Sequence, residues 1–86
     1  MEDLTKIVNI GPVLAAKLND IGIHNYQELT VIGSLEAMLR IQEDDPDVCY
    51  NMLYALEGAI RGIRWHTLPK KEREALKSEL DEVKGW

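Results

Sequence analysis

The pattern of apolar and polar positions predicts helices along almost the whole chain. No segment keeps the strict alternation that is typical of a strand. The longest apolar stripe recurs at the spacing of one helical face: Val48, Met52, Ala55, Leu56, Ala59, Ile60 and Ile63. It predicts a long central helix. Gly58 and Gly62 would share one face of this helix, so we expect another helix to approach closely there.

Capping residues predict the boundaries of the shorter helices. Asn25 and Glu28 have the spacing of a capping box for a helix that Gly33 closes. Ser34 is expected to cap the next helix, which the acidic run over residues 42–46 would end before the central helix begins at residue 47. The remaining expected helices are a short one over residues 3–6, one from Pro12 to Gly22, and one from about Pro69 that buries Leu76, Leu80 and Val83. The pattern thus predicts a single compact all-α domain of five or six helices over residues 1–86.

The segment Val8–Pro12 predicts a tight turn that leads directly into a helix. Gly11 can adopt the positive φ that a sharp reversal needs, and Pro12 suits the first helical turn. Backbone amides at such a helix start can bind a phosphate. The segment resembles a helix-hairpin-helix motif in which Asn replaces the first glycine. The candidate phosphate or DNA contacts are therefore Asn9, Ile10 and Gly11, with Lys6 and Lys17 beside them. The alternative is that the turn only packs two helices together.

Composition limits the classes of partner. The chain has 86 residues, and its ten basic and fifteen acidic residues give a net charge of −5, opposite in sign to what general attraction to DNA requires. Basic residues are concentrated in residues 64–86, where they number six against five acids. No apolar run approaches a membrane span, and Met1 is followed directly by Glu2 and Asp3. We therefore expect a cytoplasmic domain that does not contact a membrane.

The sequence offers little for catalysis or metal binding. His24 and His66 are far apart and have no ligand spacing, and the acidic loop over residues 44–47 lacks the glycine of a calcium loop. Cys49 is the only cysteine, and we interpret it as a half-buried structural residue. We expect no enzymatic activity, no cofactor, no metal ion and no small-molecule substrate.

The strongest functional candidate lies at the end of the central helix. Arginine and aromatic side chains together suit a protein–protein contact, or phosphate contact with stacking on bases. The candidate partner contacts are Arg61, Arg64, Trp65 and His66, extended by Tyr50 and Tyr54. The alternative is structural: the indole of Trp65 would fill the core while Arg61 pairs with Glu57 one turn earlier.

Several motifs together carry a family resemblance. They are the segment 9–12, the tripeptide 47–49, the block Leu53-Tyr54-Ala55-Leu56-Glu57-Gly58-Ala59-Ile60-Arg61-Gly62, and Trp65-His66 after it. With them, nearly the whole chain resembles the C-terminal domain of the TfoX (Sxy) family of bacterial competence regulators. The resemblance implies a small helical domain with a helix-hairpin-helix-like N-terminal half and a role linked to competence gene expression. In two-domain members this domain follows an N-terminal TfoX domain, to which none of these residues correspond.

The residues and the resemblance lead to one leading hypothesis and one rival. The leading hypothesis is a non-enzymatic interaction module that binds a protein partner or forms a homodimer. The rival is weak, sequence-independent DNA binding through the turn over residues 9–12 and the basic C-terminal segment.

Overall fold

The computed structural model describes residues 4–46 and 48–83, and within them every regular element is a helix. In chain order the elements are the short 3₁₀ helix η1 (Leu4–Lys6), α1 (Pro12–Asp20), α2 (Tyr26–Ile32), α3 (Ser34–Asp44), α4 (Tyr50–Arg61), the short 3₁₀ helix η2 (Trp65–Thr67) and α5 (Lys70–Val83). The predicted all-α fold class is confirmed. The residues before 4, residue 47 and the residues after 83 lie outside this description, including Asp3 and Asp47, which were expected to begin helices.

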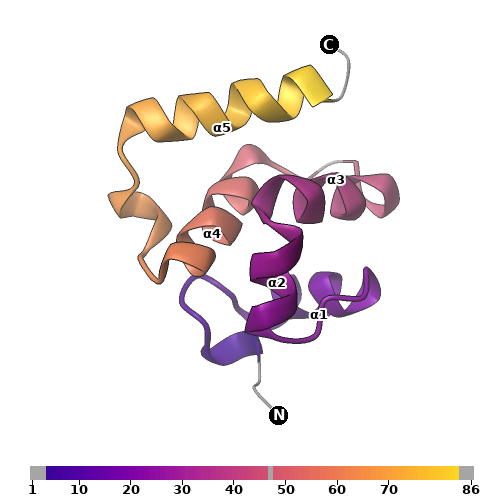
Figure 1. Cartoon of the computed structure of the whole chain (residues 1–86). Coiled ribbons are helices and arrows are strands. Elements are labelled where there is room, and N and C mark those ends of the chain that lie inside the picture. Colours follow the sequence, from indigo (N-terminus) through magenta and orange to yellow (C-terminus); the bar gives the residue numbers. More distant parts are fainter. Residues whose placement is uncertain (1–3, 47, 84–86) are drawn as a thin grey trace.

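Helix α4 is the central element, as its apolar stripe predicts. It packs against α2, α3, η2 and α5 (Figure 1). The yellow helix α5 lies across α3 and α4 at one end of the molecule, whereas η1 and α1 lie at the other. The radius of gyration is 12.0 Å, close to the value of about 12 Å expected for a compact chain of this length.

The core draws on every α-helix, on η1 and on three connecting segments. Its largest fully buried side chains are Leu18, Ile23, Leu29, Met38, Ile41, Leu53, Leu56, Leu68 and Leu80. Each such side chain contributes about 1.5–3 kcal/mol relative to an exposed position. On α5 only Leu76 and Leu80 are buried, and Val83 is 61% exposed, so the prediction that Val83 belongs to the core is wrong.

Two of the predicted helix ends are confirmed. Gly22 has a φ of +89° and follows α1, and the amide of Ile23 donates to the carbonyl of Leu18, as in a Schellman motif. At the start of α2, the Oδ1 atom of Asn25 accepts from the amide of Glu28 at 2.9 Å. The Glu28 carboxylate in turn accepts from the amide of His24, one residue earlier than a capping box requires.

The predicted start of α3 is wrong. Gly33, with a φ of +85°, closes α2 as predicted, and its amide donates to the carbonyl of Leu29. The same residue is also the N-cap of α3, so Ser34 is the first residue of that helix. The hydroxyl of Ser34 is buried and donates to Glu57 instead of capping the helix. The acidic run does end α3, as predicted, although the helix takes in the first three residues of the run and stops at Asp44. Glu and Gln are good helix formers, and the helix buries Ile41 in its last turn.

Helix α4 is shorter at both ends than the apolar stripe predicts. The helix begins after Cys49, which is exposed and not half-buried as expected, and it ends at Arg61. Gly62 has a left-handed φ of +74° and terminates the helix, so Ile63 lies outside it. Gly58 does allow a close approach, but the nearest atoms are the side chain of Asn9 and the backbone of Ile63 and Trp65, not another α-helix.

Two further findings bear on function. Among the described residues, no helix is both long enough and apolar enough to cross a membrane. The same residues contain no group of three or more histidine, cysteine or acidic side chains placed to hold a metal ion.

Candidate functional site

The turn before α1 is built differently from the prediction. Asn9, not Gly11, adopts the positive φ, at +71°. Gly11 has an extended backbone with a φ of −93° and serves as the N-cap of α1. Asn tolerates the left-handed region better than most residues, because its short polar side chain can hydrogen-bond locally.

The side chain of Asn9 connects this turn to the end of α4. Its Nδ2 atom donates to the carbonyl of Ile63 at 2.8 Å and to that of Ala55 at 3.3 Å. Its Oδ1 atom accepts from the amide of Trp65 at 3.2 Å. The side-chain amide of Asn9 therefore forms hydrogen bonds with backbone groups that are distant in sequence. Asn9 was predicted to contact phosphate, but in the structure its side chain stabilises the fold.

The other predicted phosphate contacts differ in exposure and in the partners of their side chains. Ile10 is buried, while Gly11 and Lys6 are exposed. The ammonium group of Lys17 lies 2.6 Å from a carboxylate oxygen of Asp45, just after α3. This ion pair engages one of the two basic side chains that were expected to assist phosphate binding.

Tyr54 of α4 and the two aromatic residues at the start of η2 form a stack. The ring of Trp65 lies 6.3 Å from that of Tyr54 and 4.1 Å from the imidazole of His66, with interplanar angles below 30°. Trp65 is half-buried and packs against the core, whereas His66 and Arg64 are exposed. The stack therefore has an inner side that packs against the core and an outer side that is exposed.

Tyr50 does not join this stack. Its hydroxyl donates to a carboxylate oxygen of Asp81 at 2.6 Å, and the ammonium of Lys77 lies 4.9 Å from the centre of its ring. The hydrogen bond to Asp81, with partial burial, raises the pKa of Tyr50 above its ordinary value. Tyr50 thus attaches α5 to the start of α4, and only Tyr54 extends the predicted contact surface.

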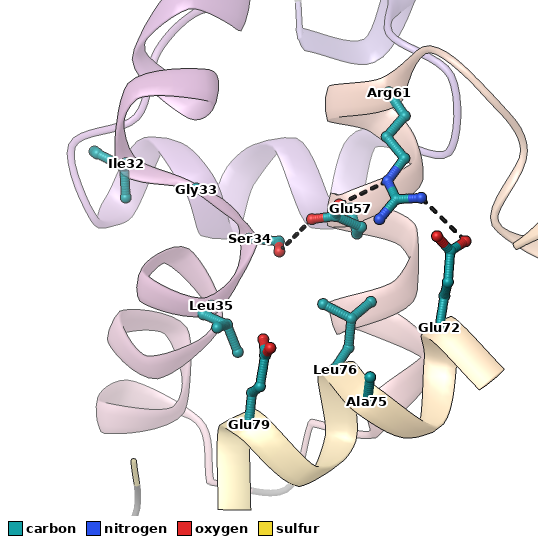
Figure 2. A pocket seen from close by; sticks show the side chains of 10 residues that line it. All are labelled: Ile32, Gly33, Ser34, Leu35, Glu57, Arg61, Glu72, Ala75, Leu76 and Glu79. Atoms are coloured by element: carbon teal, nitrogen blue, oxygen red, sulfur yellow. Dashed lines mark hydrogen bonds and ion pairs between the residues drawn. The ribbon is translucent and has the colours of Figure 1, made fainter. Parts of the chain in front are cut away.

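Arg61 belongs to a different neighbourhood, shown in Figure 2. Its Nε atom donates to Glu57 at 2.7 Å, which is the predicted pair within α4, and its Nη1 atom donates to Glu72 of α5 at 3.1 Å. The other oxygen of Glu57 accepts from the hydroxyl of Ser34 at 2.7 Å. The hydrogen bonds that Arg61 donates, first to Glu57 and then to Glu72, raise the pKa of Arg61 above its ordinary value. Ser34, Glu57, Arg61 and Glu72 therefore form a hydrogen-bonded network that joins α3, α4 and α5.

This hydrogen-bonded network forms one wall of a groove of about 550 Å³ between the α2–α3 junction, α4 and α5. The groove is lined by Ile32, Gly33, Ser34, Leu35, Glu57, Arg61, Glu72, Ala75, Leu76 and Glu79. Its charged groups are three carboxylates and one guanidinium, so the lining carries a surplus of negative charge. We call this surface the acidic groove.

Sequence reasoning identified only one part of the acidic groove. The spacing of Glu57 and Arg61 predicted their ion pair, but Ser34 was interpreted as a helix cap. The acids of α5 gave no signal, because a mostly charged helix is expected to face solvent. Only the tertiary packing of α5 places Glu72 and Glu79 opposite α3 and α4.

Comparisons with known proteins agree with the motifs of the sequence. The model of the TfoX C-terminal domain matches residues 1–80. Protein Sxy of Escherichia coli (strain K12) is 32% identical over 82 residues, which make up 95% of this chain and 39% of that protein. The chain thus spans about two fifths of the length of this curated relative.

Two crystal structures from Listeria monocytogenes are similar over almost their whole length. An uncharacterized protein in a triclinic form has a TM-score of 0.89 and 45% identity, with 98% of this chain and 96% of that chain covered. A protein of unknown function in a tetragonal form has a TM-score of 0.85 and 46% identity, with 93% and 98% covered. Since the family model covers nearly all of the sequence and these likenesses extend from end to end, the chain belongs to the TfoX C-terminal domain family.

Proposed function

We propose that this chain is a non-enzymatic interaction module of a bacterial competence regulator, and that it acts in the cytoplasm through protein contacts that include self-association. The family and the similarity to Protein Sxy support the regulatory context. The observation that carries the mode of action is electrostatic. The chain has a net charge of −5, and both Lys17 and Arg61 are engaged by the chain's own carboxylates.

The accessible side of the aromatic stack supports a protein contact. Trp, Tyr and Arg are enriched among the residues that dominate binding energies at protein interfaces. Here the half-buried Trp65 is held by Tyr54, and the exposed side chains of Arg64 and His66 adjoin it. A preorganised aromatic ring with a neighbouring guanidinium loses little conformational entropy on binding.

Size-exclusion chromatography with light scattering tests the self-association. We expect the mass to rise toward that of a dimer as the concentration of the domain increases. The variant Arg64→Glu is expected to remain monomeric. Lys71→Glu is the matched control, because it reverses the same charge at another exposed position, on α5. A monomer at every concentration would remove self-association from the proposal.

One observation favours a second candidate function, the binding of DNA phosphates at the start of α1. No side chain caps this helix, and the N-cap Gly11 is exposed, as is Lys6 at the end of η1 before the turn. Amides at an uncapped helix start attract anions. The net charge of −5 acts against this candidate at long range.

A further inference from the structure

We propose that the acidic groove holds a basic, amphipathic segment of a partner protein, with its cationic side chains next to Glu79 and its apolar side chains on the floor. This inference rests on the proposed function and adds the chemistry of the partner and the place where it binds.

The shape and floor of the acidic groove suit side chains of a peptide. Its volume of about 550 Å³ lies within the range of roughly 300–1,000 Å³ that is typical of ligand sites in proteins. Ile32, Leu35, Ala75 and Leu76 supply apolar surface from three elements, so the groove offers more than a set of charges. Such a mixture favours a segment that has both apolar and charged residues.

The charges of the acidic groove select the sign of the partner. Arg61 is already bonded to Glu57 and Glu72, so the single cation of the lining is in use. Glu79 forms no hydrogen bond or ion pair with the described residues, and Figure 2 shows its carboxylate pointing from α5 toward Ser34 and Leu35. A cationic side chain placed there would meet a surplus of negative charge, and an anionic one would be repelled.

The wall of the acidic groove is preorganised for this contact. Glu57 is held by Ser34 on one side and by Arg61 on the other, and its side chain is only 18% exposed. Ser34 is itself 5% exposed. Because these groups are already fixed by hydrogen bonds, a partner would not have to order them, which lowers the entropic cost of binding.

A direct test uses a synthetic helical peptide in which Lys and Leu recur at helical spacing, together with a counterpart in which Glu replaces every Lys. Each is titrated into the isotope-labelled domain and followed by the NMR shifts of backbone amides. The lysine peptide is expected to shift the amides of Gly33, Ser34, Leu35 and Ala75. It should bind at least about tenfold more tightly than the glutamate peptide.

Matched charge reversals on α5 isolate the acidic groove. Glu79 lines it, whereas Glu82 is exposed on the same helix, does not line it, and its side chain forms no hydrogen bond or ion pair with the described residues. Glu79→Lys is expected to weaken binding of the lysine peptide by about tenfold, and Glu82→Lys by less than about twofold. The glutamate peptide should bind Glu79→Lys better than it binds the unsubstituted domain.

The outcomes separate this inference from the proposed function. Equal effects of the two reversals, equal binding of both peptides, or shifts centred on Trp65 would each overturn the acidic groove as the site, even if the domain self-associates. Loss of self-association in Glu79→Lys alone would assign the groove to a second copy of the chain and overturn the assignment to a different partner. A domain that self-associates normally but binds neither peptide would refute the inference and leave the proposed function standing.

Discussion

The side chain of Asn9 holds the turn before α1 against the C-terminal end of α4. Asn9 also adopts the positive φ for which a helix-hairpin-helix motif uses glycine. We predict that Asn9→Gly lowers the free energy of unfolding by about 1–3 kcal/mol, because backbone groups of Ala55, Ile63 and Trp65 lose their partner. Asn9→Ala should cost about 1 kcal/mol more, since alanine also pays for the positive φ. Urea denaturation of both variants measures the two effects separately.

Gly11 provides the control for this prediction. Its φ is −93°, and a Cβ atom there would meet no heavy atom within 4 Å. Gly11→Ala should therefore change the free energy of unfolding by less than about 1 kcal/mol, because the lower entropy of the unfolded chain offsets the poorer N-cap that alanine makes. A greater loss for Gly11→Ala than for Asn9→Gly would mean that the conformational constraint lies at Gly11 after all.

At the scale of elements, variants at the junction between α4 and η2 distinguish residues that stabilise the fold from residues that are available to a partner. Trp65→Ala is expected to cost about 2–4 kcal/mol, because the half-buried indole packs against the core and on Tyr54. Arg61→Ala should cost only about 0.5 kcal/mol, since its side chain is 38% exposed and its ion pairs are screened by solvent. Thermal melts, run beside the light-scattering assay, test this. A strongly destabilised Arg61→Ala with normal association would identify Arg61 as a packing residue.

The attachment of α5 to α4 is expected to depend on pH in the alkaline range. The bond to Asp81 raises the pKa of Tyr50 above 10.0, so the folded state favours the neutral phenol. This contribution is complete below the ordinary pKa and is lost as the pH rises through the raised value. Tyr50→Phe should therefore be less stable than the parent at about pH 8, and the difference should shrink toward about pH 11. In the Asp81→Asn background, the effect of Tyr50→Phe on stability should depend less on pH, as measured by denaturation. If the effect of Tyr50→Phe in the parent domain were the same at both pH values, the assignment of the raised pKa to the bond with Asp81 would be contradicted.

The elements show which parts of the structure are encoded locally. The apolar stripe of α4 and the cap at Asn25 were predictable, because helical periodicity and capping depend on residues close in sequence. Ser34 was misread because its hydroxyl has two suitable partners, and the tertiary contact with Glu57 prevailed over the local cap. The acidic groove depends on how α5 docks, so its residues share no sequence pattern that would predict it.

For the whole molecule, the balance of charge decides between a protein and a nucleic acid as partner. The domain carries a net charge of −5, and the pairing of Lys17 with Asp45 leaves the turn before α1 with little basic support. Long-range attraction to a polyanion needs an excess of positive charge on the approaching face. The same negative charge would instead attract a basic partner and keep the domain soluble before it binds.

A titration of labelled duplex DNA, followed by fluorescence anisotropy at low salt, puts this balance to the test. We predict no rise in anisotropy up to roughly 100 μM domain, which is the weak end of non-specific DNA binding. Binding that weakened with salt at a logarithmic slope of about −0.9 per phosphate, and that was reduced in Lys6→Ala, would instead assign the turn before α1 to phosphate contact. Lys71→Ala distinguishes the two ends of the chain, because it removes an exposed charge from α5 and leaves the turn unchanged. DNA binding lost in Lys71→Ala but not in Lys6→Ala would place the contact on the basic C-terminal segment, and the acidic total would then have concealed a locally basic surface.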